Sequence, residues 1–418
     1  MLAHRVRAWL RNSTESRLRH LLLLLYLVTA LFDAAGKALA AHPAINRALS
    51  SHVKGASAEE MREAARPSGN FEIFRTASRH LLEQKDLYAE YPAEHSDRFK
   101  YSPSFALLFA PFAFLWWPLA LFLWSSLNVL VLFMAVERAL PGRAGLLALL
   151  CLHLEVLRAM QNAQSNALVA GLIILAFVAL ERANAWRAAL AVALGACVKI
   201  FPLAALAFAI PRRRVLRTGL WAAGIGALLL ALPLVVTSPD VLRAQYASWR
   251  GVESSDAVQR WFSVMELLYR ATGLSLPNWP VQLAGTLALL APIASRRDRW
   301  DDARFRFLFL CSVLLYVVLF NHQAERASFV IAFAGATLWF AGSPAATWRR
   351  VMWAIAFLTV TLMSTLIPGA IFRGPTAMLL RLCVPTLAIW LAIQWELWSR
   401  ASGTELRREL DLDVALQR

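Results

Sequence analysis

The sequence predicts an all-α integral membrane protein in which a bundle of helices crosses a lipid bilayer many times. Of its residues, 59% are hydrophobic and 17% are charged, whereas soluble domains average about 45–50% apolar and about 25% charged residues. Apolar segments with the length of a transmembrane helix, about 20 residues, recur along the chain. These segments lack the alternating pattern of a barrel strand, and lipid cannot satisfy free backbone amides, so helices are the remaining structure.

The first apolar segment, residues 21–32, follows several basic residues and in this respect is similar to a signal peptide. Asp33 and Lys37 separate it from the small-residue motif at residues 38–40, and many further spans follow, so we interpret it as the first membrane anchor. Clear spanning segments follow at residues 118–136, 165–180, 216–236, 279–294, 305–320, 327–340, 351–367 and 377–398.

Two segments in the first half of the chain are less regular. Residues 103–115 are short for a span, and residues 184–210 are interrupted at 199–202. Irregular backbone at membrane depth is tolerated only where it is covered by protein or lines an aqueous cavity, so we expect one or both segments to be broken or re-entrant and to lie near a site. Apolar length predicts roughly 10 to 13 helices that cross or enter the bilayer.

The formal charge of +16 is concentrated in the termini and in short loops between apolar segments. Basic loops mark the cytoplasmic face of a membrane protein, so we assign the charge to topology and expect no nucleic acid partner. Both termini are then cytoplasmic, within a single membrane domain over residues 1–418. Residues 33–100 and 238–278 form two exterior loops, and the first is predicted to contain amphipathic helices lying on the membrane. The basic clusters are Arg212, Arg213, Arg214 and Arg217, then Arg296, Arg297 and Arg299, then Arg349 and Arg350.

Polar side chains at the exterior ends of the spans are candidates for a binding site. In the first exterior loop, Glu72, Asp97 and Lys100 bring carboxylates and a lysine to the membrane surface, although a solvated amphipathic helix has the same composition. Lys199 stands within an apolar segment, where a charge is costly; it suits an anionic ligand, or else it snorkels to the surface. Amides that suit either sugar hydroxyls or helix caps lie between two spans, at Gln161, Asn162, Gln164 and Asn166.

The exterior connection of residues 321–326 carries further polar groups at Asn321, His322 and Arg326. No second histidine stands at ligand spacing from His322, so no metal site is predicted. The four cysteines fall within apolar segments without close pairing and are interpreted as packing residues. No cofactor is predicted.

Taken in order, these stretches resemble glycosyltransferase family 87 over residues 70–326. The family pattern of an acidic residue, hydrophobic residues and a Leu-Tyr pair corresponds here to Asn70, Phe71, Ile73, Phe74, Leu87 and Tyr88, and its later motifs to Tyr101-Ser102-Pro103, Gln164-Ser165-Asn166 and Lys199-Ile200-Phe201-Pro202. The resemblance implies a multispanning GT-C-like helical bundle in the bacterial inner membrane. It also implies a mannosyltransferase-like enzyme that uses a polyprenyl-phosphate sugar as donor and a lipid or glycan as acceptor, with its active site facing the periplasm.

One position departs from the family pattern, because the aspartate taken as the catalytic base aligns with Asn70. Asparagine does not accept a proton at neutral pH, so Glu72 or Asp97 is expected to serve as the base in an inverting transfer. The resemblance assigns the donor phosphate to Lys100, Lys199 and Arg326. It assigns sugar or acceptor binding to Asn70, Tyr101, Gln161, Asn162, Gln164, Asn166, Asn321 and His322.

Two other functions fit the same composition. A transporter or lipid flippase would also explain broken helices and charge within the membrane, although no internal repeat is evident. A non-catalytic membrane scaffold is favoured by the missing aspartate. Transfer of sugar from a polyprenyl-phosphate donor would separate the three.

Overall fold

The computed structural model describes residues 2–42, 69–95, 97–363 and 374–399. Helices and the loops that join them make up the described residues, which contain no strand, so the all-α prediction is confirmed. Five helical stretches are long and apolar enough to cross a membrane, namely Thr14–Ala40, Trp117–Ala139, Arg143–Gln161, Val215–Val235 and Pro375–Trp398. Shorter apolar helices are Pro103–Ala113, Asn166–Glu181, Ala185–Val198 and Arg326–Gly342.

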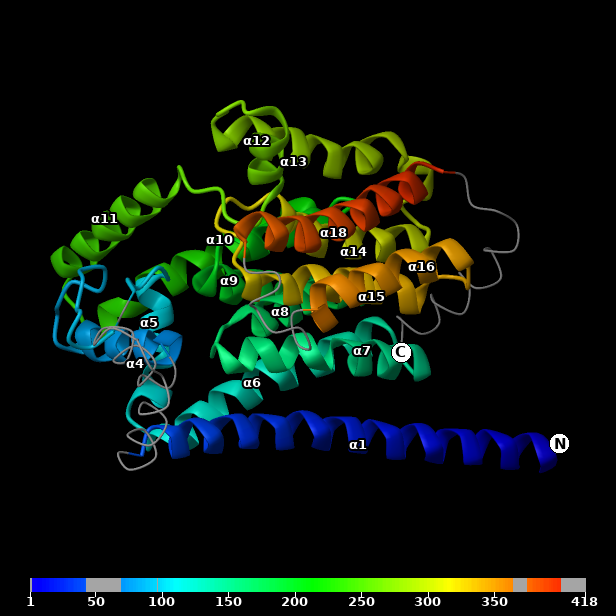
Figure 1. Ribbon diagram of the computed structural model, residues 1–418, viewed down its shortest axis with the longest axis horizontal. Coiled ribbons are helices and arrows are strands. Elements are labelled where there is room, and N and C mark those ends of the chain that lie inside the picture. The colour runs from blue at the N-terminus through cyan, green and yellow to red at the C-terminus, as the bar shows by residue number, and fades with distance from the viewer. Residues whose placement is uncertain (1, 43–68, 96, 364–373, 400–418) are drawn as a thin grey trace.

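The chain order of the elements places short helices between the long ones (Figure 1). The first half contains α1 (Leu2–Ala40), α4 (Gly69–Leu82), α5 (Pro103–Ala113), α6 (Trp117–Ala139), α7 (Arg143–Gln161), α8 (Asn166–Glu181), α9 (Ala185–Val198), η1 (Phe201–Ala209), α10 (Val215–Ala231) and η2 (Leu232–Val235). The second half contains α11 (Pro239–Asp256), α12 (Val264–Thr272), α13 (Asn278–Ser295), η3 (Arg297–Arg299), α14 (Ala303–Leu319), η4 (Arg326–Ser328), α15 (Phe329–Gly342), α16 (Thr347–Ala356), η5 (Phe357–Leu362) and α18 (Pro375–Trp398).

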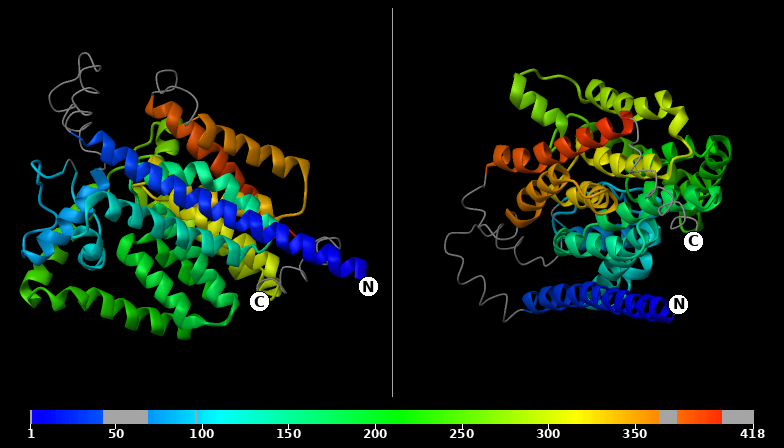
Figure 2. Two further views of the ribbon diagram at one scale, coloured as in Figure 1. Left: turned by 90° about the horizontal axis from the view of Figure 1, so that it is seen from below. Right: turned by 90° about the vertical axis from the view of Figure 1, so that its right-hand side faces the viewer.

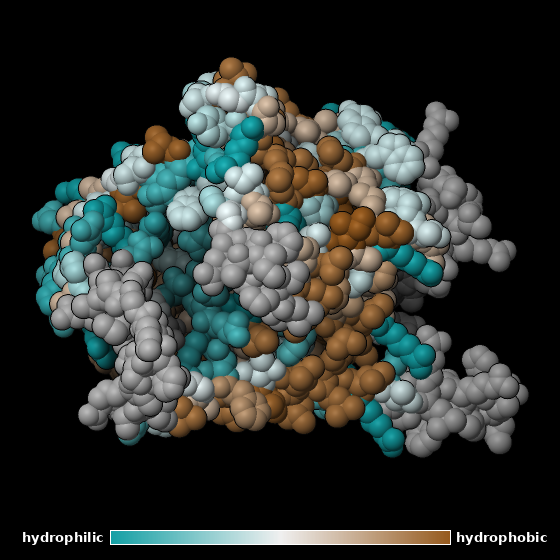
Figure 3. Space-filling model, in the orientation of Figure 1, coloured by the Kyte–Doolittle hydropathy of each residue, from teal (hydrophilic) through white to brown (hydrophobic). Residues whose placement is uncertain are grey.

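The core of the bundle is formed by helices that are apolar on all sides, as expected where protein surrounds a helix completely. In α14 and α15 nearly every side chain is buried, and α8 packs against both α6 and α9. By contrast, α1 lies along the lower edge of the bundle in Figure 1 and in the right-hand view of Figure 2, and it packs against α6 and α7. Its outer leucines remain exposed, and Figure 3 shows a broad hydrophobic surface in this region, consistent with contact to lipid.

The first helix continues beyond its apolar stretch. Asp33 and Lys37, expected at the start of an exterior loop, lie inside α1, where their side chains form an ion pair of 2.8 Å. Such a pair four residues apart stabilises a helix, which explains why counting apolar residues ends this helix too early. Of the predicted first exterior loop, residues 43–68 and 96 lie outside the described residues.

The amphipathic pattern of the first exterior loop forms α4. Its apolar positions Ile73, Ala77 and Leu81 are buried, and the helix packs against α5. The apolar face of α4 therefore packs on protein, which anchors this helix beside the bundle.

The interrupted segment at residues 184–210 forms a hairpin of two short helices, α9 and η1. The arms approach so closely that a Cβ added at Gly195 would lie 2.7 Å from Cβ of Pro202. Lys199 lies in the turn of this hairpin, which is therefore the broken element expected from the sequence.

Candidate active site

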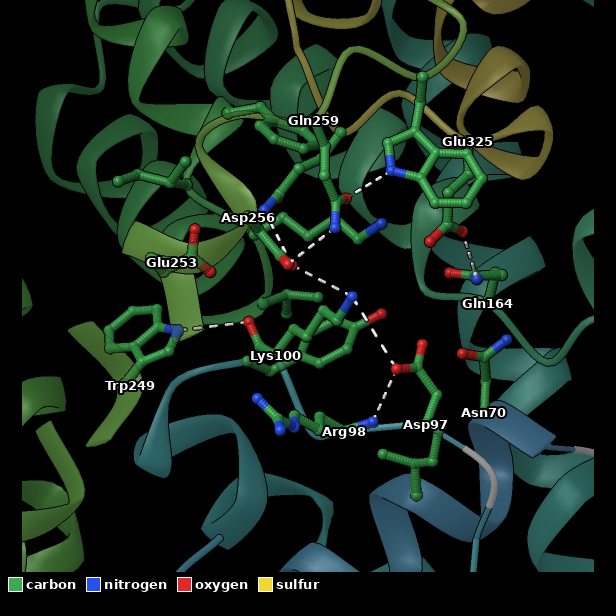
Figure 4. Close-up of a pocket in the computed structure, with 18 of the residues that line it drawn as sticks. Asn70, Asp97, Arg98, Lys100, Gln164, Trp249, Glu253, Asp256, Gln259 and Glu325 are labelled. Atoms are coloured by element: carbon green, nitrogen blue, oxygen red, sulfur yellow. Dashed lines mark hydrogen bonds and ion pairs between the residues drawn. The ribbon is translucent and has the colours of Figure 1, made fainter. Parts of the chain in front are cut away.

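A cavity of about 490 Å³ opens at the end of the bundle where α4, α9 and α11 meet the connection between α14 and α15 (Figure 4). We call it the main cavity. A second cavity of about 400 Å³, the side cavity, adjoins it and shares part of its lining. Figure 3 shows a hydrophilic hollow in the left part of the molecule, next to the hydrophobic surface.

The extended segment of residues 97–102 forms one wall of the main cavity. Ser102 caps α5 by accepting a hydrogen bond from the backbone amide of Phe105 at 3.1 Å, and its hydroxyl donates to the carbonyl of Cys197 at 2.7 Å. The Tyr88 hydroxyl donates to the carbonyl of Tyr101 at 2.7 Å. These contacts hold the segment against the end of α9, so Lys100 and Lys199 face the same cavity.

Lys100 and Asp256 form the central ion pair of the main cavity, with 3.1 Å between Nζ and Oδ2. Asp256 also accepts hydrogen bonds from Gln259 at 2.9 Å and Gln323 at 3.3 Å. Asp97 lies 3.9 Å from the Lys100 ammonium and its side chain is 64% exposed. Burial lowers the pKa of Lys100, but the negative charges of Asp97 and Asp256 outweigh it, so the net pKa is raised and Lys100 stays positively charged.

Lys199 is the second lysine of the main cavity. Its ammonium lies 5.9 Å from the ring centre of Tyr101 and 5.8 Å from that of Phe201. Within the described ranges, no carboxylate lies within ion-pair distance of it. Glu325, whose carboxylate accepts a hydrogen bond from Gln164 at 3.1 Å, lines the same cavity. Lys199 is therefore a half-buried lysine beside two aromatic rings, and the nearest charge named for it is that of Glu325, which lies beyond ion-pair distance.

Several residues predicted from the sequence do come together around the two cavities. Asn70, Asp97 and Gln164 line both, and Lys100, Tyr101 and Lys199 line the main cavity. Asn162 and Arg326 line the side cavity.

Other predicted residues line neither cavity. Glu72 accepts a hydrogen bond from Trp117 and lies 3.9 Å from Arg75, on the face of α4 away from Asn70. Two positions along a helix correspond to about 200° of rotation, which explains why neighbours in sequence point apart. The remaining residues outside both linings are Gln161, Asn166, Asn321 and His322.

The polar groups outside the cavities are engaged in local contacts. Asn166 is fully buried, and its amide nitrogen lies 3.5 Å from the side-chain oxygen of Gln164. The side-chain oxygen of Asn321 accepts from the backbone amide of Gln323 at 3.1 Å, and Nδ1 of His322 lies 3.2 Å from the amide of Gln282. Arg326 reaches the side cavity, yet it donates to both oxygens of Glu155 at 2.7 and 2.9 Å.

Sequence reasoning missed three carboxylates of the main cavity, Glu253, Asp256 and Glu325. The first two lie three residues apart on α11, and burial followed by the charge of Asp256 raises the pKa of Glu253. The sequence places α11 only within the second exterior loop, and Glu325 only within the polar connection of residues 321–326. No group of three His, Cys, Asp or Glu side chains in the described part of the chain is arranged to hold a metal ion.

Comparison with known proteins places the chain in a family. A crystal structure of ArnT from Cupriavidus metallidurans bound to undecaprenyl phosphate aligns with 79% of this chain and 72% of its own, at 14% identity and a TM-score of 0.34. No curated protein sequence matches. The sequence profile of glycosyltransferase family 87 matches residues 99–321, which is more than half of the chain and includes Lys100, Gln164, Lys199 and Asp256. This membrane protein therefore belongs to glycosyltransferase family 87.

Proposed function

We propose that the protein transfers a mannose-like sugar from a polyprenyl-phosphate donor to an acceptor hydroxyl in the main cavity, with inversion at the anomeric carbon. The observation that carries this proposal is the placement of Lys100 and Lys199 beside the exposed carboxylate of Asp97 in one cavity. The chain belongs to a glycosyltransferase family, and a glycosyltransferase can use the two lysines to bind a phosphate and the carboxylate to accept a proton.

The lysines suit the phosphate of the donor. The phosphate leaves as an anion, and positive groups held in a partly dry cavity stabilise the charge that develops on it. The Lys199 ammonium lies within 6 Å of the ring centres of Tyr101 and Phe201, and among the described residues no carboxylate forms an ion pair with it, so a phosphate would supply a close counter-charge. Lys100 is already paired with Asp256, and we assign it a supporting role.

Asp97 is the base that we propose. As the acceptor hydroxyl attacks the anomeric carbon, its proton passes to the Asp97 carboxylate, and the bond between that carbon and the phosphate oxygen breaks with its electron pair on the phosphate. Asp97 lines both cavities and is well exposed, whereas Glu72 is held by Trp117 outside them. Asn70, at the position of the family aspartate, lines the same wall, where its amide donates to the carbonyl of Asn162 at 2.9 Å.

We propose that the cavities face the periplasm of a bacterium and that both termini are cytoplasmic. The basic clusters of Arg212–Arg214 and Arg296–Arg299 lie at the loops that join η1 to α10 and α13 to α14, away from the cavities. Basic loops remain on the cytoplasmic side during insertion, which supports this orientation in the inner membrane.

Assay of the purified protein with radiolabelled polyprenyl-phosphate mannose, arabinose and glucose tests the proposed function. We expect transfer from one of these donors to an added acceptor, or slow release of the sugar to water when no acceptor is present. Movement of the intact labelled lipid across vesicles without cleavage of the sugar would contradict the proposal and support a flippase.

A further inference from the structure

Three arginines that the proposed function does not use lie near one another beside the side cavity. Arg158 and Arg326 line this cavity, from α7 and η4, and Arg381 comes from α18. Their positive charges act on one another, since the charge of Arg326 reaches both of the others and that of Arg381 reaches Arg158. We call these three residues the guanidinium cluster.

Among the described residues, one carboxylate pairs with the cluster. Glu155 accepts hydrogen bonds from Arg326 at 2.7 and 2.9 Å, and its charge also reaches Arg158. Arg381 makes no ion pair and no hydrogen bond with another described residue, and its Nε is buried without an acceptor. Nε of Arg326 is likewise buried without an acceptor in the described part of the chain. Arg381 therefore contributes a positive charge that no described carboxylate offsets by contact.

An oxyanion would complete these contacts. Arginine stays protonated in proteins, so the cluster cannot relieve its repulsion by releasing a proton. A buried N–H group without an acceptor costs free energy, and a guanidinium presents its donors in a plane that matches the oxygens of a phosphate. The oxygens of one phosphate can accept from more than one guanidinium. The cluster therefore favours a phosphate as its ligand.

Arg381 also lies at the border between the protein and the surrounding lipid. Its helix, α18, is long and apolar enough to cross a membrane. Leu380, next to Arg381, is 47% exposed, and Val384, three residues beyond it, is 46% exposed. Residues three apart share a face of a helix, so an exposed apolar surface continues directly from the guanidinium. Free phosphate gains nothing from this surface, whereas the hydrocarbon chains of a lipid do.

The depth of Arg381 in the membrane suits the same ligand. It lies about 9 Å along α18 from the first residue of the helix, Pro375. Arginine side chains extend from such positions toward the membrane surface, where lipid phosphates lie. Arg326 is tied to the same region, because its guanidinium donates to the carbonyl of Val360 in η5 at 2.8 Å and η5 packs against α18.

From these observations we infer that the guanidinium cluster binds the phosphate of an anionic membrane phospholipid, whose hydrocarbon chains lie along the exposed face of α18. The site is distinct from the position at Lys199 that we propose for the donor phosphate, since no member of the cluster lines the main cavity. Zwitterionic phospholipids carry an ammonium group beside the phosphate, and the cluster would repel it. Phosphatidylglycerol is an anionic phospholipid without this group. The inference does not depend on sugar transfer.

Occupancy of the site should stabilise the folded protein. The phosphate would join α18 to α7 and η4 through charge-assisted hydrogen bonds, which are about twice as strong as neutral ones. A lipid that binds only the folded chain raises the stability of that chain as its concentration increases. Thermal unfolding therefore reports on the site without any assay of sugar transfer.

Native mass spectrometry of the full chain in detergent tests the inference. Phosphatidylglycerol and phosphatidylcholine with the same hydrocarbon chains are offered in equal amounts, and inorganic phosphate is added to a parallel sample. We expect one phosphatidylglycerol to stay bound at detergent concentrations that remove phosphatidylcholine, and inorganic phosphate at the same concentration to leave it in place. Equal retention of the two lipids, or displacement of phosphatidylglycerol by inorganic phosphate, would overturn the assignment to an anionic lipid.

Arg381→Met removes the member of the cluster that has no partner among the described residues. It should weaken the binding of phosphatidylglycerol by about tenfold to a hundredfold, the effect of a lost hydrogen bond to a charged group, and abolish the thermal stabilisation that this lipid gives. Arg381→Lys keeps the charge without the planar donors and should restore part of both. Without lipid, the unfolding temperature of Arg381→Met should equal that of the unaltered protein, which shows that the variant is folded.

Arg243→Met is the matched control, since Arg243 lies in an exposed pair with Asp240 and lines neither cavity. This variant should retain the lipid. Unchanged affinity for phosphatidylglycerol in Arg381→Met, or an equal loss in Arg243→Met, would mean that Arg381 only extends to the membrane surface and would overturn the inference. If Arg381→Met does not fold, the comparison of the two lipids on the unaltered protein still decides the question.

Discussion

Charged side chains are paired more completely at one end of the bundle than at the other. At the arginine end, which we define by the residues around Glu181 and Glu396, every buried carboxylate described is surrounded by donors. Both oxygens of Glu181 accept from Arg306 at 2.8 Å. Glu396 accepts from Arg304 at 2.8 Å, from Arg349 at 2.9 and 3.0 Å and from the Trp339 indole at 3.0 Å.

At the cavity end, Lys100 is paired with Asp256 at 3.1 Å and Arg326 with Glu155 at 2.7 Å, but two other charged side chains are held less closely. Lys199 has rings beside it and no carboxylate within 4 Å in the described chain, and Asp97 reaches Lys100 only at 3.9 Å. This contrast separates charged side chains that stabilise the fold from those that are available to a ligand. Saturated ion pairs hold helices together, whereas a charge without a close partner has coordination left for a ligand.

Removal of the proposed base should have the largest effect. Asp97→Asn is expected to lower kcat by about 10²- to 10⁴-fold, the usual contribution of general base catalysis, without loss of thermal stability, because Asp97 is exposed. Glu83→Gln, in an exposed pair with Lys85 outside both cavities, is the matched control. If Asp97→Asn retains full kcat, the base is not Asp97, and Glu325 on the same wall becomes the next carboxylate to test.

The arginine end should respond in stability and not in chemistry. Glu396→Gln removes the buried carboxylate that Arg304 and Arg349 share, and removal of one partner of a buried ion pair costs about 3–5 kcal/mol. Thermal unfolding in detergent measures this loss, with Asp240→Asn, in a fully exposed pair, as a control that should not shift it. A Glu396→Gln protein that keeps its thermal stability but has a reduced kcat would contradict the assignment of the arginine end to stability.

Replacement of Lys199 by methionine tests the cavity end of the bundle. Donor affinity should fall by about tenfold to a hundredfold, the effect of a lost hydrogen bond to a charged group, while stability is kept or increased because an unneutralised cation is removed. Lys199→Arg should restore binding only in part, since a planar guanidinium needs a different fit. Lys85→Met, at an exposed lysine, serves as control. Unchanged donor affinity in Lys199→Met would mean that this lysine snorkels and binds no phosphate.

The smallest expected effect concerns pH. Burial, then the charge of Asp256, raises the pKa of Glu253 above 4.5, so the folded protein holds this proton more tightly than the unfolded chain. The resulting stability is present below pH 4.5 and is lost as pH rises through the raised pKa. Glu253→Gln carries no charge at any pH and should lose less stability between about pH 4 and about pH 8. If the free energy of unfolding of the two proteins changes equally with pH over this range, the pKa of Glu253 is not raised by folding.

The fold follows from hydropathy because a bilayer requires long apolar helices, and the sequence contains them. The placement of Lys199 near a helix break was predictable for the same reason. Asp256 and Glu325 were not, because their approach depends on a contact between distant loops, in which the backbone amide of Phe262 donates to the carbonyl of Ala324 at 3.0 Å. No local pattern encodes that contact. Glu72 shows the opposite error, since closeness to Asn70 in sequence places it on another face of α4.

The hairpin of α9 and η1 is shorter than the membrane it enters. With 14 residues, α9 is about 21 Å long at the usual α-helical rise, and η1, with nine residues, is about 18 Å long, against a hydrocarbon thickness of about 30 Å. Either its tip lies below the headgroups or the lipids around it thin to meet it. The acyl-chain length of the surrounding lipids therefore sets the depth of Lys199 below the lipid headgroups. Lipids with shorter acyl chains reduce this depth and bring the headgroups level with Lys199.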